Sequence, residues 1–404
     1  MGRLKLCYLS TGIMDTAFDS QVLPVLVTAA KEGFSLFHIS FDPFKRNVTE
    51  RYLEKKKQLN LIGIETFYIR QLPPISKGSL MLDGKRVLSP FYHWWGKKQK
   101  VAIHCRGHLN SFRGLLLKEK NPGWIYVIAD LRGAVGDEVL HGRKGIVRSF
   151  GSRYLWNFYR RVEDQVVRKA DKILCVSYAF KKFLQINYGV DNISVIPTFV
   201  DTSRFNFSKS VRDFYRKQLG LTNRTVLVYS GGVASWQRVD DVIQLFIAMR
   251  QRIKNLFMLF LTHQPSVIHQ MIKDKIDSQD IQVIQASYSE VPGYLCAADV
   301  GVLLREDILT NHVAAPIKFS EYMCCGLPCI ISKNIGDTEQ VLRSVHAGII
   351  IDSEKGLPTL DEFQNLLSLN REEISMVMGK KFSSQIFLSE LFKLYRTFAG
   401  SEIY

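Results

Sequence analysis

The sequence contains no long apolar run and no regular cysteine pattern. No stretch reaches 18 consecutive apolar residues, so we expect no segment that spans a bilayer. The seven cysteines are odd in number and none is spaced Cys-x-x-Cys, which favours reduced core thiols in the cytoplasm over disulfides or zinc ligands. The first nine residues lead into Ser10-Thr11-Gly12 without the apolar core of a secretory signal, so we expect them to form a strand.

Four motifs of phosphate, acyl and metal chemistry are also missing. Neither half has Gly-x-Gly-x-x-Gly after its first predicted strand, because the first half offers only Thr11-Gly12 and the second only Gly231-Gly232. This argues against an NAD enzyme. The chain has no Walker Gly-Lys-Ser/Thr and no Gly-x-Ser-x-Gly nucleophile elbow. It has no Asp-x-Asp either, so a carboxylate pair that holds a metal against a diphosphate is not indicated.

Positive charge is concentrated in the first half of the chain. The formal net charge is +16, and residues 1–200 carry 32 Lys and Arg against 16 Asp and Glu, whereas residues 201–404 carry 22 of each. A field of one sign on one domain attracts anionic partners such as a membrane surface, a nucleic acid or an acidic glycan. The excess of Lys and Arg could also serve only to keep the protein soluble.

Short apolar segments alternate with helical patterns along the whole chain. Strands that alternate with helices predict parallel sheets covered on both faces. We therefore predict an α/β protein with two Rossmann-like domains facing a central cleft, divided by the polar stretch that begins at 197–201. The predicted strands are 4–9, 36–39, 64–69, 101–104, 124–128, 173–176 and 193–196 in the first half, and 225–229, 256–261, 281–284, 300–304, 329–331 and 348–351 in the second.

A helix is predicted in detail after the segment 300–304. Pro316 suits its first residue, Gly326 its C-terminal cap, and Pro328 prevents its continuation. Because the helix follows a strand and a loop, its N-terminus should open on the carboxyl edge of the sheet. Backbone amides at such a helix end attract phosphate.

Two charged residues lie on the first turns of this predicted helix. Lys318 adds a positive charge near the N-terminus, and Glu321 follows three residues later on the same face. A cation beside a carboxylate suits the phosphates of a nucleotide and its ribose hydroxyls. The same spacing is also that of a surface salt bridge.

Three groups of residues carry a family resemblance when they are taken in order. The first is Ala170-Asp171-Lys172-Ile173, Val176-Ser177 and Val195-Ile196-Pro197 to Val200-Asp201; the second is Tyr229-Ser230-Gly231-Gly232, Trp236-Gln237 and Asp240-Asp241; the third is Pro316-Ile317-Lys318-Phe319-Ser320-Glu321-Tyr322-Met323 with Cys325-Gly326-Leu327-Pro328. With these motifs the chain resembles, over essentially its whole length, the retaining glycosyltransferases of family 4, which have the two-domain GT-B architecture.

The resemblance implies how the work is divided between the domains. Residues 201–382 would bind a UDP- or GDP-sugar, and residues 1–200, joined by a C-terminal helix at 383–400, would hold the acceptor. It implies a retaining hexosyltransferase that needs no metal or other cofactor. The acceptor would be a glycan, lipid-linked, in the synthesis of a surface polysaccharide or glycolipid.

The resemblance also suggests site residues. Glu321 would bind the ribose hydroxyls, and Lys318 with Gly231 and Gly232 would hold the diphosphate. Ser287 and Tyr288 lie where the family contacts the nucleobase, Gln237 and Arg238 stand where it often has a phosphate-binding Lys-Gly pair, and Thr11, Gly12 and His104 end strands that face the cleft. We expect His104 and Asp130 to hold the substrate sugar or the acceptor hydroxyl.

Alternatives remain open at three of these positions. His104 could be a satisfied histidine at a strand end, and Asp130 could form a local ion pair with Arg132. The family often has a glutamate that contacts the transferred sugar eight positions before residue 321, and Val313 stands there in this chain.

Two segments of the basic half combine aromatic and basic residues. One is 91–100, with Trp94 and Trp95 beside Lys97, Lys98 and Lys100; the other is 148–161. Rings beside Lys and Arg are typical of a membrane interface, which predicts a peripheral protein on the inner face of the cell membrane. The rings could instead belong to the core.

Two other functions compete with glycosyl transfer. A GT-B-like sugar-nucleotide epimerase would use the same donor without an acceptor. A nucleic-acid-binding protein would explain a basic, aromatic surface, but the chain has no recognised nucleic-acid module, so we expect no nucleic-acid partner.

Overall fold

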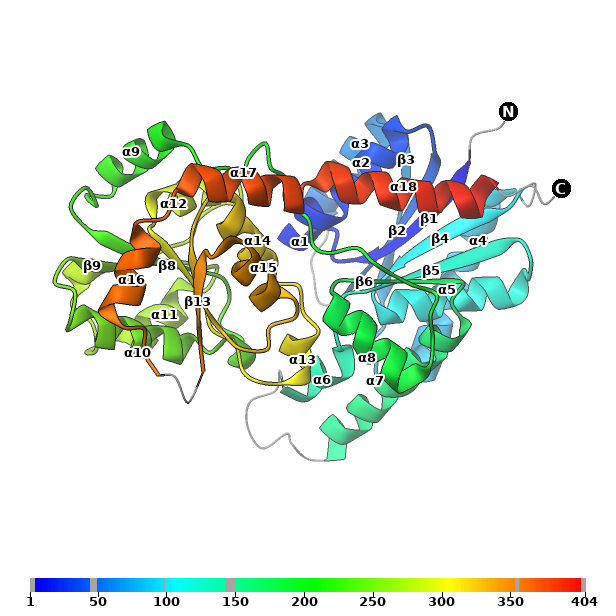
Figure 1. Ribbon diagram of the computed structural model, residues 1–404. Helices are drawn as coiled ribbons and strands as arrows, with labels where there is room; N and C mark the ends of the chain where they lie inside the picture. Colours follow the sequence, from blue (N-terminus) through cyan, green and yellow to red (C-terminus); the bar gives the residue numbers. More distant parts are fainter. Residues whose placement is uncertain (1–3, 44–48, 97–98, 142–149, 353–355, 401–404) are drawn as a thin grey trace. The chain divides into compact units, whose positions relative to one another are not determined.

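The computed structural model describes residues 4–43, 49–96, 99–141, 150–352 and 356–400 (Figure 1). The chain divides into two compact units. The first unit comprises Met1–Pro197 and Gln385–Tyr404, and the second comprises Thr198–Ser384. No helix in the described ranges is long and apolar enough to cross a membrane.

A seven-stranded parallel sheet forms the centre of the first unit, in the order β3-β2-β1-β4-β5-β6-β7. All seven predicted segments are strands. The ends differ where pairing extends beyond the apolar run, as in β2, whose last residues Asp42 and Pro43 pair with Arg70 and Gln71 of β3. The strands are β1 (Lys5–Thr11), β2 (Ser35–Pro43), β3 (Ile64–Gln71), β4 (Val101–Arg106), β5 (Ile125–Leu131), β6 (Lys172–Cys175) and β7 (Ile193–Val195).

Helices flank this sheet (Figure 1). Short apolar strands with buried residues along most of their length need such cover on both faces. The helices of the first unit are α1 (Thr16–Gln21), α2 (Leu23–Lys31), α3 (Thr49–Leu61), α4 (Lys77–Trp95), α5 (His108–Lys120), α6 (Val135–His141), α7 (Phe150–Lys169) and α8 (Tyr178–Tyr188).

The last helix, α18 (Ser384–Gly400), packs on the first unit. Phe392 contacts Phe34, and Arg396 forms an ion pair with Glu32 after α2. Tyr395 is fully buried, whereas Phe387, Leu394 and Phe398 are only partly buried. The helix therefore buries Leu388, Leu391, Phe392 and Tyr395 most deeply.

The second unit is built on a six-stranded parallel sheet in the order β10-β9-β8-β11-β12-β13. The six predicted segments are all strands, three of them with unchanged ends. The strands are β8 (Thr225–Ser230), β9 (Leu256–Leu261), β10 (Ile281–Ile284), β11 (Val300–Leu303), β12 (Cys329–Ser332) and β13 (Gly348–Ile351).

The helices of the second unit follow its strands in an alternating order. This confirms the predicted pair of Rossmann-like parallel-sheet units. The helices are α9 (Lys209–Gln218), α10 (Val239–Arg250), α11 (Pro265–Ile272), α12 (Val291–Ala297), α13 (Leu309–His312), α14 (Ile317–Cys324), α15 (Thr338–Val345), α16 (Leu360–Leu367) and α17 (Arg371–Phe382), with 3₁₀ turns η2 (Ser235–Gln237) and η3 (Ser278–Asp280).

Each sheet has one point at which the strand order reverses direction. In the first sheet this point lies between β1 and β4, and in the second between β8 and β11. Open α/β sheets bind their ligands outside the carboxyl ends of the strands at such a point, because the neighbouring connections turn away and leave a crevice. The topology therefore directs the search for ligand-binding residues to these two places.

Candidate functional site

Helix α14 is fixed against the switch point of the second sheet by one tyrosine. Tyr322 is fully buried, and its hydroxyl oxygen accepts a hydrogen bond of 2.6 Å from the backbone N–H of Ser230 at the end of β8. The ring lies over Gly301 of β11, where an added Cβ would come within 2.5 Å of it. Pro316 is the N-cap of α14 rather than its first residue, and Gly326 follows the C-cap with φ +68°.

Lys318 on the first turn of α14 reaches the loop after β8. Its ammonium donates a hydrogen bond of 3.2 Å to Gln237 and lies 5.4 Å from the ring centroid of Tyr229. A Cβ on Gly231 would lie 1.7 Å from the Lys318 Nζ, so the ammonium fills the space that any other residue would occupy. The structure thus brings Gly231, Gln237 and Lys318 together, as the sequence predicted.

Burial changes the protonation of both charged residues on α14. Burial first, and then the positive charge of Arg305, lower the pKa of Lys318 to about 7, against the opposing effect of Glu321. Burial also raises the pKa of Glu321 to about 8, against the opposing effect of Lys318. Glu321 is only 6% exposed, so the pair is not a surface salt bridge.

Arg305 is a residue of this site that the sequence analysis missed. It follows β11, and its backbone N–H donates to the Ser332 hydroxyl at 2.8 Å. The next residue, Glu306, donates its backbone N–H to Trp236 at 3.0 Å, which joins this loop to the turn that carries Gln237. An arginine directly after a strand of the switch point was the available signal.

Three other predicted donor residues lie apart from this group. Arg238 is 46% exposed at its side chain and forms an ion pair with Asp241 of α10. Ser287 is exposed and donates to Glu290, and Tyr288 packs on Phe205 with ring centroids 5.5 Å apart. Gly232 shares the loop of Gly231, and its carbonyl accepts from the Tyr229 hydroxyl at 2.6 Å. Val313 is buried.

At the switch point of the first sheet, Asp130 is the centre of a buried charge cluster. Arg106 and Arg132 each place a guanidinium nitrogen 3.4 Å from its carboxylate, and His104 lies 3.2 Å from it. Burial alone would raise the pKa of Asp130, but these neighbours hold it well below its usual range. The ion pair with Arg132 that the sequence left open is therefore present.

His104 is a satisfied histidine in this cluster. Its Nε2 faces Asp130, its Nδ1 accepts from the Tyr395 hydroxyl at 2.8 Å, and its ring stacks on Tyr8 at 4.4 Å. Burial lowers its pKa despite the hydrogen bond to Asp130. The predicted direct contact of His104 with a substrate is therefore corrected, because both ring nitrogens are engaged and the residue is only 2% exposed.

The other predicted residues of the first unit end strand β1. Thr11 is exposed, and its hydroxyl accepts from the Asn110 side chain at 3.1 Å. Gly12 has φ +79°, and a Cβ there would come within 2.2 Å of the Asp15 carboxylate. These residues lie at the same sheet edge as Arg106, which places them at the switch point of the first sheet.

The aromatic residues of 91–100 are largely part of the core. Phe91 and Trp95 are buried, and Trp94 stacks on Phe37 at 5.3 Å beneath the ammonium of Lys5. The prediction that Trp94 and Trp95 form an aromatic membrane surface is therefore wrong. Their spacing on α4 with Leu80 and Val87 was the signal of a core stripe. Lys97 and Lys98 lie outside the described residues.

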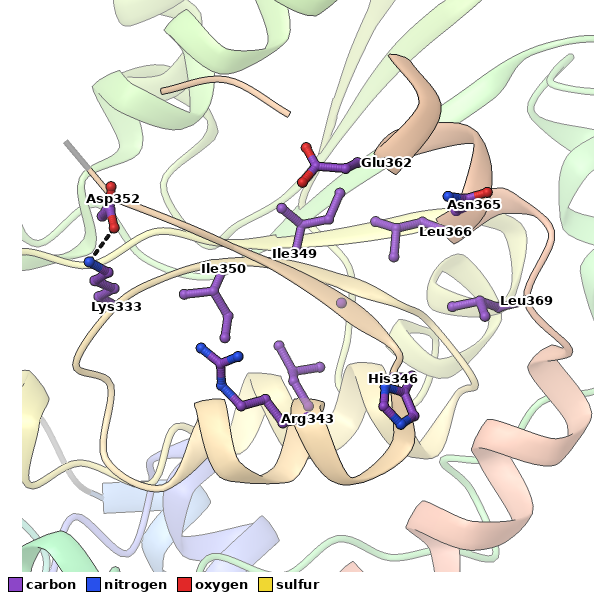
Figure 2. Close-up of a pocket in the computed structure, with 12 residues that line it drawn as sticks. Lys333, Arg343, His346, Ile349, Ile350, Asp352, Glu362, Asn365, Leu366 and Leu369 are labelled. Carbon is purple, nitrogen blue, oxygen red and sulfur yellow. Dashed lines mark ion pairs between the residues drawn. The ribbon is translucent and has the colours of Figure 1, made fainter. Parts of the chain in front are cut away.

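One pocket of about 490 Å³ lies at the edge strand β13, between α15 and α16 (Figure 2). Figure 2 shows the ion pair between Lys333 and Asp352 among its lining residues, together with Arg343 and His346. None of the predicted site residues lines it. Within the described ranges, no three His, Cys, Asp or Glu side chains are grouped so that they could hold a metal ion.

Two family models match the chain. Residues 72–204 match Glycosyltransferase Family 4, and residues 211–373 match the glycosyl transferases group 1. A search of curated proteins gave no match.

Solved structures resemble the chain over nearly its full length. A sucrose-phosphate synthase from Thermosynechococcus elongatus is 15% identical, with 99% of this chain and 100% of that chain covered and a TM-score of 0.69. A glycosyltransferase from Rickettsia africae is 12% identical, with 98% and 99% covered and a TM-score of 0.70. The Anabaena protein HepE, solved with UDP-glucose, is 15% identical, with 98% and 100% covered and a TM-score of 0.69. At these identities the likeness establishes the fold alone.

Proposed function

Because the chain belongs to the GT-B glycosyltransferases, with a family 4 segment followed by a group 1 segment, we propose that it moves a hexose from a UDP- or GDP-sugar to a glycan acceptor with retention of configuration. One observation carries the proposal. The Lys318 ammonium lies against Gly231 at the switch point of the second sheet. A cation held against a glycine backbone, which has no side chain, suits the diphosphate of a nucleotide sugar at this place.

The leaving group sets the chemical demand on the site. When the bond between the anomeric carbon and the phosphate oxygen breaks, its electron pair stays on the nucleoside diphosphate, whose negative charge grows. A fixed ammonium at that oxygen stabilises the transition state more than the ground state. An anion at this place also favours the charged form of Lys318 and so opposes the lowering of its pKa by burial.

The acceptor hydroxyl completes the reaction. Its oxygen forms the new bond on the face that the phosphate leaves, and its proton passes to the leaving phosphate, so no enzyme nucleophile is required. Glu321 binds the ribose hydroxyls in this proposal. Arg106 and Arg132 are each 18% exposed at their side chains around Asp130, and they give the first unit a positive edge that suits an acceptor with an anionic group.

A product assay separates this function from an epimerase. The protein is incubated with a panel of UDP- and GDP-sugars, with and without a lipid-linked acceptor. Transfer predicts a new disaccharide that forms only when the acceptor is present. Formation of an epimeric nucleotide sugar without any disaccharide would contradict the proposal.

We expect the transfer reaction to survive EDTA. In this proposal the charge of the leaving diphosphate is met by side-chain cations and backbone amides. The measurement is turnover before and after treatment with EDTA and gel filtration. Complete loss of turnover that Mg²⁺ or Mn²⁺ restores would show that a metal carries this charge instead.

The proposed acceptor is lipid-linked, and the basic first unit offers a surface for an anionic membrane on the cytoplasmic side. Lys77 of α4 and Arg161 of α7 are exposed beside a pocket of about 470 Å³ that Phe112, Phe158 and the 57% exposed Tyr154 also line. Each basic residue near such a membrane contributes on the order of 1 kcal/mol, over a Debye length of roughly 8 Å at physiological salt.

We therefore expect Lys77→Glu with Arg161→Glu to weaken co-sedimentation with anionic liposomes and to slow transfer to a lipid-linked acceptor. Transfer to a short soluble acceptor should change much less. The control exchanges two exposed lysines of α9 in the second unit, Lys209→Glu with Lys217→Glu. Two results would rule out this surface. One is liposome binding by the wild type that depends on neither salt nor lipid charge; the other is an equal loss of liposome binding in both double variants.

A further inference from the structure

Arg305 is a partly buried cation just after the end of β11. In the part of the chain that the structure describes, its guanidinium makes no hydrogen bond and has no carboxylate as a counterion, and its Nε is buried without a partner. Its backbone, by contrast, is fixed, because the Ser332 hydroxyl donates to its carbonyl at 3.1 Å and accepts from its N–H at 2.8 Å. The strand end thus holds a charged group in a defined place and leaves it unpaired.

The neighbours of Arg305 are the residues of the donor site. Glu306 bonds to Trp236 beside Gln237, and Gln237 accepts from Lys318. The charge of Arg305 lowers the pKa of Lys318, which shows that the two cations lie within electrostatic reach. Burial lowers the pKa of Arg305, and Tyr229 and Tyr322 act in the opposite direction.

Two neighbouring cations without a paired carboxylate are costly in a folded protein. A partly buried charge loses hydration, and the repulsion between two like charges adds to that loss. Such an arrangement is expected at a functional site, where a ligand supplies the opposite charge. A guanidinium is suited to a phosphoryl group because its planar fork donates two parallel hydrogen bonds.

We infer that Arg305 is the second cation of the donor site and binds the phosphoryl group that a nucleoside diphosphate has and a monophosphate lacks. This inference rests on the proposed function. It moves to Arg305 the phosphate contact that the sequence suggested for Arg238, whose charge is already paired with Asp241. Lys318 and Arg305 together then face the diphosphate, whose second phosphoryl group distinguishes it from a monophosphate.

The test compares Arg305→Gln with Arg238→Gln by titration calorimetry, using UDP, GDP, UMP and GMP. For the diphosphate that the wild type binds, we expect Arg305→Gln to weaken affinity by about 10- to 100-fold, the effect of losing a hydrogen bond to a charged group. Affinity for the corresponding monophosphate should change by less than about threefold. Arg238→Gln should bind both as the wild type does.

The melting temperature without ligand separates binding from structure. Removal of an uncompensated charge should leave the ligand-free melting temperature of Arg305→Gln unchanged or raise it, and Arg305→Met should behave in the same way. Wild-type diphosphate affinity in Arg305→Gln would overturn the inference, and so would equal losses for diphosphate and monophosphate with a lowered melting temperature. If the wild type binds none of the four nucleotides, the proposed function fails as well.

Discussion

Lys318→Ala is expected to reduce turnover by about 100- to 1000-fold, the loss that follows removal of one preorganised group that stabilises charge in a transition state. The ammonium is held by Gln237 and fills the space over Gly231, and alanine leaves this position without a cation. Glu321→Ala should also cut turnover severely, because its carboxyl group faces the ribose in the proposed site. Steady-state transfer assays on both variants measure these effects.

The control is Lys333→Ala, which removes a half-exposed lysine of the same unit that is paired with Asp352. It should keep near-wild-type turnover. The fold of Lys318→Ala should be intact, because deleting a cation whose pKa is lowered by burial relieves a cost. Near-normal turnover and donor affinity in both Lys318→Ala and Glu321→Ala would show that the pair has no part in the reaction.

Gly231→Ala should produce a loss of turnover of similar size although it replaces no charged residue. The added Cβ would lie 1.7 Å from the Lys318 Nζ, and the φ of +156° is one that L residues rarely adopt. The flexible lysine can move away, so the protein should still fold, but its ammonium would leave the phosphate position. We expect donor affinity and turnover to fall together.

Gly232→Ala is the matched control for this prediction. A Cβ at Gly232 would meet only the side chains of Gln264 at 3.5 Å and Gln237 at 4.0 Å, which are ordinary contacts. This variant should lose little donor affinity. Equal effects of the two substitutions would mean that the loop matters as a whole and that Gly231 makes no special room for Lys318.

The strands could be predicted from the sequence because their signal is local. A buried parallel strand is a short apolar run, and 256–261 and 281–284 match β9 and β10 without adjustment. The ends of β2 could not be predicted, because its polar end is paired only through the neighbouring β3. Pro316 is the N-cap of α14, one position earlier in the helix than the first helical position that the sequence predicted for it. A proline fits either position, because the backbone N–H that it lacks would have no partner within the helix at either one.

The roles of single residues were harder to predict than their positions. His104 does end a strand at the switch point, but its second partner, Tyr395, comes from the last helix of the chain, and no spacing in the sequence indicates that contact. The role of Arg305 was missed because this residue lacks a partner, whereas that of His104 was misjudged because it has an additional one. The lack of a partner becomes visible only when the surroundings of Arg305 are known.

The central claim is that the second unit binds a nucleoside diphosphate at Lys318. A thermal-shift screen of UDP, GDP, ADP, CDP and TDP on the wild type and on Lys318→Ala tests it most directly. A ligand at 100 times its Kd stabilises the native state by about 2.7 kcal/mol, a shift of several degrees. The account predicts that at least one diphosphate raises the wild-type melting temperature and that Lys318→Ala loses most of this shift. No shift with any diphosphate, or the same shift in both proteins, would contradict it.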